Sequence, residues 1–282
     1  MIWFWLSAGS SAINFLLFKW FDRFGIRTFQ AIVANYFVCV ALGISFAPNQ
    51  DITSVFNALP IASLIGLIYI LLFWLIGRSS QRIGIAATVT AAKVSMILPV
   101  VFGLYFLLES GGTMKLLAIG LAIPAVILSS RRKSQASYGV RAYLLPLTIF
   151  LGSGLADILL AYTQKNLLQS NQQAGFLVLL FGTSAAIGAI GLWYAHCKKI
   201  DKVHPNSLAA GIVLGGFNFM SVFALMQALK SIQSSTLFPL NNLTTILLST
   251  TLAFFLFHEK LEKAQGIGLL LAIVSLILLL QF

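Results

Sequence analysis

The sequence predicts an all-α membrane protein with ten transmembrane helices. Its composition and the length of its apolar runs both indicate this class. Hydrophobic residues make up 59% of the 282 residues, and charged residues only 9%. A soluble chain carries roughly 25% charged residues, because polar side chains must cover its core. The excess apolar side chains of this chain must therefore face lipid.

Each apolar run is long enough to cross a bilayer as a helix, which takes about 20 mostly apolar residues. Strands in an open sheet would leave backbone groups unpaired in lipid. The runs are also too long and too evenly apolar for barrel strands. The predicted helices cover residues 2–20, 29–47, 60–77, 84–108, 114–130, 143–163, 174–195, 207–228, 234–257 and 265–281.

The two halves of the chain resemble each other weakly. A shift of 150 residues aligns residues 82–109 with residues 232–259, and each segment ends in a glutamate, Glu109 or Glu259. Five helices per half is an odd number, so the second copy would enter the membrane upside down. This is the inverted-repeat plan of secondary transporters, in which the substrate site lies near mid-membrane between the repeats.

A second alignment, with a shift of 143 residues, places Asn14 opposite Asp157 in the two halves. A polar, basic stretch of sequence divides the chain nearly in the middle. The predicted organisation is therefore a first five-helix repeat, a central basic loop and a second, inverted five-helix repeat, over residues 1–130, 131–141 and 142–282 respectively.

One sequence pattern occurs once per half: an apolar helix ending in Glu, a short polar turn, and a Gly-containing helix. It reads HEKLEKAQGIGLLLAIVSLILL over residues 258–279 and, more loosely, ILPVVFGLYFLLESGGTMKLLAIGLAI over residues 97–123. With the helix count and the repeat, it resembles the drug/metabolite transporter superfamily in its ten-helix EamA-like form. That resemblance implies a secondary transporter of metabolites such as amino acids, nucleosides, sugars or their derivatives.

The net charge of +11 has a topological interpretation. The basic residues form short clusters between apolar runs, with no nucleic-acid motif, so we expect no nucleic-acid partner. Lys and Arg gather in the odd-numbered loops, which the positive-inside rule places in the cytoplasm. We therefore expect a multi-pass protein of the bacterial inner membrane with both termini outside. Many ten-helix relatives are thought to have cytoplasmic termini, and here we follow the charge.

Lys93 is the most informative single residue. It lies nine residues after the start and fifteen before the end of the predicted span 84–108, too deep for its side chain to reach the surface. Such a charge needs a partner or a wet cavity. Lys93 is therefore either an anchor for an anion or carboxylate, or half of an ion pair that only fixes helix packing. A lysine at this position also departs from the EamA-like pattern.

Asp157 is the only acidic residue deep in a predicted span. Three roles are open to it: pairing with Lys93, carrying a coupling proton, or binding a substrate amine. We name both charges as substrate-binding candidates, and Asp157 also as the coupling candidate.

Neutral polar and aromatic residues inside the spans complete the candidate site. Amides are costly to bury unless they are hydrogen-bonded, so each either lines the cavity or joins helices. Aromatic residues either line the cavity or belong to an interfacial belt. The substrate-binding candidates of these two kinds are Asn14, Asn35, Asn218, Asn241, Tyr36, Tyr69 and Trp74. Asn242 is a further amide within a span.

Pro99 and Pro239 interrupt two helices that the repeat relates. Because proline removes a backbone hydrogen bond, we expect a bend at each, serving either as a gating element or as a static kink.

No enzyme motif, cofactor-binding motif or metal-ligand spacing is present in the sequence, so we expect neither an enzyme nor a cofactor. The leading hypothesis is a secondary transporter that moves an amino acid-like, nucleoside-like or anionic metabolite by alternating access. Proton coupling through Asp157 remains open. The alternative is a membrane-embedded lipid-handling protein or enzyme. The expected partners are the substrate and the bilayer, and a homodimer is left open.

Overall fold

The computed structural model describes residues 1–47, 52–82, 85–129, 144–169, 171–198, 204–257 and 262–281. Within these ranges the chain is helical and contains no strand. Its helices are α1 (Ile2–Arg23), α2 (Thr28–Ser45), η1 (Ile52–Ala58, a 3-10 helix), α3 (Leu59–Arg82), α4 (Ile85–Val94), α5 (Ile97–Tyr105), α6 (Thr113–Ser129), α7 (Leu144–Asn166), α8 (Gln173–Cys197), α9 (Pro205–Ala228), α10 (Ser234–Phe257) and α11 (Lys263–Leu279).

All ten predicted segments are helical, and the all-α prediction is confirmed. Among the described residues, six helices are long and apolar enough to cross a membrane, and four shorter apolar helices occupy the other predicted spans. The predicted span 84–108 contains two successive helices, α4 and α5, among its described residues.

The break between α4 and α5 has a local cause. A proline lacks the N–H that would bond the carbonyl four residues earlier, and its ring crowds that carbonyl. For Pro99 that residue is Ser95, which lies at the break, and its carbonyl accepts the N–H of Leu98 at 2.9 Å instead. The interruption at Pro99 is confirmed. Pro239 lies inside a continuous α10, so the helix is not broken there, and the bend expected at Pro239 stays a prediction.

The chain forms two compact units. Unit 1 comprises Met1–Phe73 and Tyr162–Gln227, and unit 2 comprises Trp74–Ala161 and Ala228–Phe282. Each unit thus combines segments from both halves of the sequence, so the units differ from the two predicted repeats. The repeats themselves stay a prediction about the sequence.

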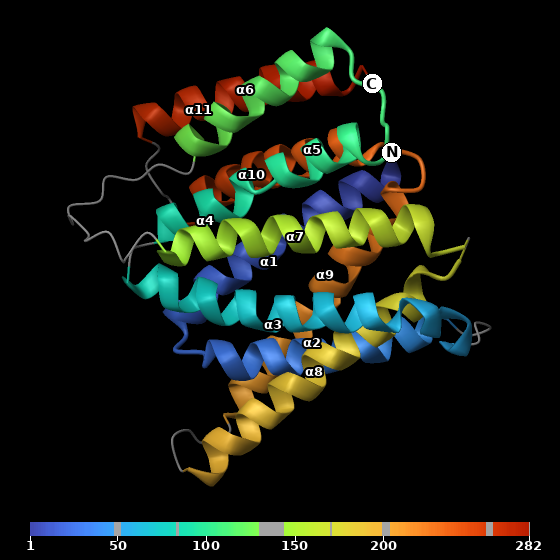
Figure 1. Ribbon diagram of the computed structural model, residues 1–282. Coiled ribbons are helices and arrows are strands. Elements are labelled where there is room, and N and C mark those ends of the chain that lie inside the picture. Colours follow the sequence, from blue (N-terminus) through green and yellow to red (C-terminus); the bar gives the residue numbers. More distant parts are fainter. Residues whose placement is uncertain are drawn as a thin grey trace. The chain divides into compact units, whose positions relative to one another are not determined.

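In unit 1, α2 and α8 run antiparallel in close contact (Figure 1). Glycine makes this approach possible. A Cβ on Gly43 would lie 2.7 Å from Val178 Cγ2, and one on Gly188 would lie 2.8 Å from Val33 Cγ2. Small residues at such points let membrane helices pack closely, where the hydrophobic effect gives no drive toward association.

Unit 2 contains two similar pairs, α6 with α11 and α5 with α10 (Figure 1). Gly268 of α11 packs against the backbone at Ser129 of α6. Further along, the Ser275 hydroxyl donates to the Ala118 carbonyl at 2.7 Å. These contacts make the α6–α11 pair antiparallel.

The three pairs join helices that the predicted repeat relates: α2 with α8, α5 with α10, and α6 with α11. The inverted repeat itself stays a prediction.

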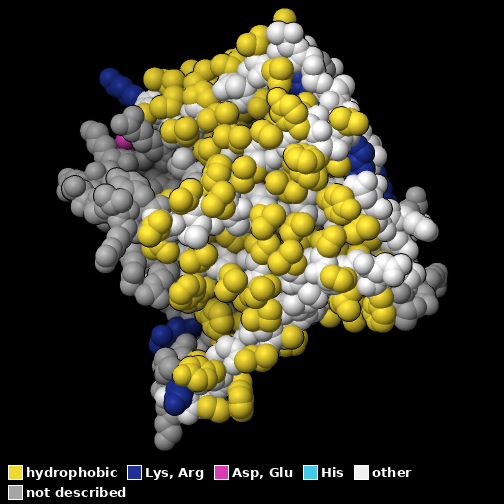
Figure 2. All heavy atoms as spheres, in the orientation of Figure 1, with side chains coloured by type: hydrophobic (Ala, Val, Ile, Leu, Met, Phe, Trp, Pro, Cys, Tyr) yellow, Lys and Arg dark blue, Asp and Glu magenta, His cyan; other side chains and the backbone are white. Residues whose placement is uncertain are grey.

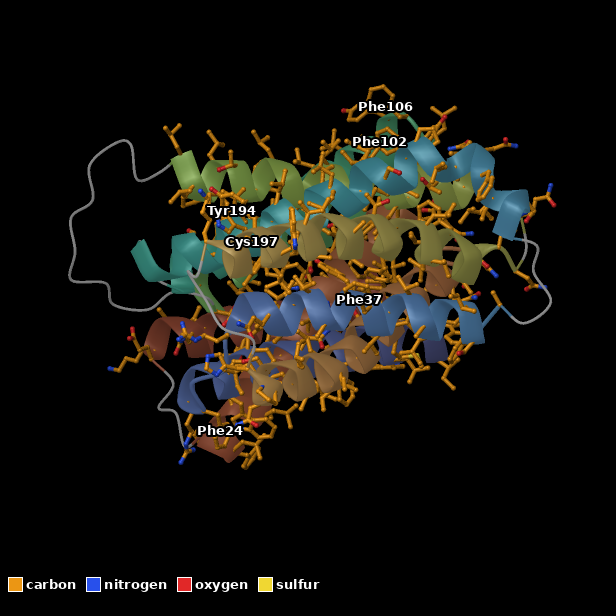
Figure 3. The ribbon with its side chains drawn as sticks, turned by 90° about the horizontal axis from the view of Figure 1, so that it is seen from below. Phe24, Phe37, Phe102, Phe106, Tyr194 and Cys197 are labelled. Atoms are coloured by element: carbon orange, nitrogen blue, oxygen red, sulfur yellow. The ribbon has the colours of Figure 1, made fainter. Side chains whose placement is uncertain are left out.

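Large apolar side chains are exposed on the helices. Hydrophobic side chains cover much of the coloured part of the face in Figure 2, with few charged ones among them. Phe37 of α2 is 54% exposed. Phe102 and Phe106, with ring centroids 5.2 Å apart, project together at the end of α5 (Figure 3). Soluble proteins rarely expose large apolar patches, so lipid is the solvent that fits this surface.

Candidate functional site

Lys93 lies in the last turn of α4, next to the break before α5. Its Nζ donates a hydrogen bond to Asn242 Oδ1 of α10 at 3.0 Å. The side chain is partly buried. A helix C-terminus carries partial negative charge, so the end of α4 favours a cation at this position. The contact joins the two sequence halves inside unit 2.

Asp157 belongs to the part of α7 that lies in unit 2, and it is also partly buried. Its charge and the charge of Lys93 act on each other electrostatically. Such mutual attraction offsets part of the cost of placing either charge in a low-dielectric interior. Unit 2 therefore holds a cation that is hydrogen-bonded to an amide, and a carboxylate whose charge interacts with that cation.

Two other polar residues of α10, one and two positions from Asn242 in the sequence, are buried. The Asn241 Oδ1 and Thr244 Oγ1 atoms have no hydrogen-bond partner among the described residues. Residues three apart lie on the same face of a helix. A buried polar atom left unpaired costs about 1–3 kcal/mol, so water or a ligand is the expected partner of each.

Sequence reasoning named Asn241 as a site residue, whereas the neighbouring Asn242 makes the contact with Lys93. Adjacent helical residues point about 100° apart, so the rotation of α10 decides which amide faces α4. Both residues are apparent in the sequence as amides within a span. Nothing in the sequence fixes the rotation of the helix.

The unit 1 candidates other than Asn14 fall into two groups. The first is an amide–thiol chain, in which Cys39 donates to Asn35 Oδ1 at 3.5 Å and accepts from Asn218 Nδ2 at 3.8 Å. Asn35 also donates to the Ile32 carbonyl at 3.3 Å. Asn35 and Asn218 thus link α2 to α9, which fits the helix-joining alternative.

The second group is aromatic. The rings of Tyr36 and Tyr69 both pack on Phe181, with centroids 5.9 and 6.4 Å away. Tyr36 is fully buried. Its hydroxyl has no partner among the described residues, and neither has Asn14 Oδ1 on α1. The last aromatic candidate, Trp74, is the first residue of unit 2 and is 51% exposed, which fits a belt position better than a cavity wall.

Sequence reasoning missed a network at the ends of α5 and α10. Glu109 follows α5, and its Oε1 accepts from the Ser234 N–H and hydroxyl at 2.8 and 2.7 Å. Its Oε2 accepts from the N–H of Ser235 at 2.8 Å and from the Ser235 hydroxyl. Burial alone would raise the pKa of Glu109, but the hydrogen bonds from Ser235 and Ser234 lower it overall.

Lys115 completes this network. It lies in α6, inside the predicted span 114–130, with 1% of its surface exposed. Its Nζ donates to the Ser110 carbonyl at 2.9 Å and to Gln233 Oε1 at 2.7 Å. The signal available in the sequence was the alignment of Glu109 with Glu259. Glu259 itself lies outside the described residues.

Within the described ranges, no group of three or more His, Cys, Asp or Glu residues is placed to hold a metal ion.

A family model, the EamA-like transporter family, matches residues 140–281 of the chain. The chain belongs to the EamA-like transporter family. It is 22% identical over 261 residues to an uncharacterized protein of Haemophilus influenzae, covering 88% of this chain and 86% of that one. It also shares its fold with a protein of known crystal structure, with a TM-score of 0.76 and 14% identity over 98% of this chain and 94% of that one.

Membership in the EamA-like family makes the chain a multi-pass membrane protein and a membrane transporter of small molecules. The candidate residues are therefore candidates for contact with a transported molecule.

Proposed function

We propose that this EamA-like protein is a secondary transporter that moves a small polar metabolite by alternating access and binds it at Lys93, Asn242 and Asp157. The observation that carries the proposal is the 3.0 Å hydrogen bond from Lys93 Nζ to Asn242 Oδ1. Lys93 belongs to the first sequence half, and Asn242 to the second. A site shared by two repeats is what the inverted-repeat plan requires.

The chemistry of these residues limits the substrate class. An ammonium group attracts an anion or a substrate carboxylate, and a neighbouring amide can orient it through a hydrogen bond. Asp157 attracts a substrate amine or carries a coupling proton. An amino acid-like substrate would meet both charges, an anionic one would meet Lys93 alone, and a nucleoside-like one would rely mainly on amides and rings.

The break between α4 and α5 supports alternating access as the mechanism. Secondary transporters place their sites at interrupted helices, where freed backbone groups and helix ends face the substrate. Here the break follows Lys93 by two residues. A helix that is already divided at this point can change its bend without losing further backbone hydrogen bonds.

Uptake of a labelled metabolite panel into proteoliposomes tests the proposal. The panel contains amino acids, nucleosides and organic anions, and the protein is wild type or Lys93→Ala. We expect the wild type to accumulate at least one metabolite and Lys93→Ala to accumulate none. Lys165→Ala, an exposed lysine at the end of α7, is the matched control and should transport normally. Equal uptake by wild type and Lys93→Ala would contradict the proposed site.

We also propose that both termini lie outside the cytoplasm of a bacterial cell, from the bias of Lys and Arg toward the odd loops. A C-terminal phosphatase fusion should then be active, and a fluorescent fusion dark. The reverse pair of results would refute this orientation.

A further inference from the structure

We propose that Glu109 is a positioning residue that holds α10 in the register in which Asn242 meets Lys93. This inference rests on the proposed function, because it assigns Glu109 a role at that substrate site. Glu109 itself lies away from the site, in the turn between α5 and α6.

The first step concerns the contacts between Glu109 and the start of α10, which we call the clamp. Both carboxylate oxygens of Glu109 accept hydrogen bonds there, from the N–H and hydroxyl groups of Ser234 and Ser235. The first N–H groups of a helix have no partner within the helix, and its N-terminus favours negative charge. Hydrogen bonds to an ionised acceptor are the strong ones. The carboxylate therefore fixes both the position and the rotation of this helix end.

The second step is the support behind the clamp. Buried Lys115 bridges the Ser110 carbonyl, next to Glu109, and the Gln233 side chain, next to Ser234. The Glu109 N–H also donates to the Gly103 carbonyl of α5 at 3.0 Å. Hydrogen bonds thus connect the turn after α5 to the start of α6 and to the start of α10.

The third step connects the clamp to the site. Ser234 and Asn242 are eight residues apart on one continuous helix, a distance of about 12 Å along its axis. A helix transmits position and rotation over such a length. A slip of one residue would move Asn242 by about 1.5 Å and turn it by about 100°, away from Lys93. The Lys93–Asn242 contact therefore depends on the register that Glu109 sets.

The test begins with Glu109→Gln, which preserves size but removes the charge and replaces one acceptor oxygen with a donor facing an N–H. We expect the KM for the substrate to rise about tenfold, the effect of losing a charge-assisted hydrogen bond, while the maximal rate per inserted protein is largely kept. Glu109→Asp should recover most of the affinity. Glu262→Gln removes a carboxylate from the capping box of α11 and should leave KM unchanged.

A double-mutant cycle tests whether Glu109 acts through Asn242. If it does, Glu109→Gln should add little to the KM increase already caused by Asn242→Ala. Multiplying effects, or an unchanged KM in Glu109→Gln, would overturn the positioning role.

The same cycle measured by thermal unfolding in detergent needs no substrate. If the Tm losses of the variants are coupled but the wild type takes up no metabolite, the positioning role is upheld and the transport function is contradicted. If the Tm losses are additive and the wild type takes up a metabolite normally, the transport function is upheld and the positioning role is contradicted.

Discussion

The two compact units differ in the charge of the polar side chains that they bury. In unit 1, the charged residues with described side chains are all exposed, namely Arg23, Arg27, Lys165 and Lys198. Its buried polar groups, such as Tyr36 and Asn35, are neutral. Unit 2 instead holds Lys93, Glu109, Lys115 and Asp157 buried or partly buried.

Charge in a low-dielectric interior is costly unless it is paired or put to use. Lys93, Glu109 and Lys115 in unit 2 have hydrogen-bond partners, and Asp157 interacts electrostatically with Lys93. The proposed function therefore assigns recognition of a charged substrate group to unit 2, while the buried polar groups of unit 1 are neutral.

The largest expected effect on transport comes from removing either of two charges in unit 2. Lys93→Ala and Asp157→Asn should each lower the initial transport rate at least about 100-fold, equivalent to losing one strong charge-assisted interaction in the transition between states. Initial uptake rates, normalised to inserted protein, measure this. Wild-type-like transport by either variant would make that charge structural.

A smaller effect is expected from the neutral group of unit 1. Tyr36→Phe removes a buried hydroxyl with no partner among the described residues. We expect uptake to change by no more than about threefold and Tm not to fall, because no existing hydrogen bond is lost. Uptake and thermal unfolding of the same preparation measure both. A loss as large as that of Lys93→Ala would erase the distinction between the units.

Pro99 and Pro239 both lie in unit 2, one at a helix break and one inside a continuous helix, so their substitutions can be compared directly. Pro99→Ala restores a backbone donor opposite Ser95 at the break beside Lys93 and should slow turnover a few-fold while leaving substrate binding largely intact. Pro239→Ala acts in a continuous helix and should slow turnover less. Single-turnover and equilibrium binding measurements separate the two quantities. Unchanged turnover in both variants would leave static kinks as the interpretation.

The smallest effect concerns pH. The pKa of Glu109 is lowered in the folded protein, so its ionised form stabilises the fold above the ordinary carboxyl pKa, and this contribution is lost as pH falls through the lowered pKa. The Tm difference between wild type and Glu109→Gln should therefore persist at pH 7 and shrink below about pH 4. Thermal unfolding across pH 3–8 measures it. A difference that grows on acidification would mean that the carboxylate is not the stabilising form.

Much of the fold was predictable because lipid imposes a simple rule. Each apolar run had to be a helix, and the break in the fourth span follows from Pro99. The site was only partly predictable. Lys93 and Asp157 could be singled out because charged residues deep in a predicted span are unusual. Which of Asn241 and Asn242 contacts Lys93 depends on the rotation of α10, and helix packing sets that rotation. In the sequence, Glu109 and Lys115 have the positions of residues at a membrane edge. Their contacts with Gln233 and Ser234 span more than 100 residues of sequence and form only in the folded chain.

The most direct test of the account is a double-mutant cycle on Lys93 and Asp157. Initial uptake rates are measured for wild type, Lys93→Ala, Asp157→Asn and the double variant in proteoliposomes of equal protein content. If the two charges serve one site, the double variant should be about as slow as the slower single variant, so the losses are strongly non-additive. Rate losses that simply multiply would show that the two charges belong to separate sites and would contradict the account.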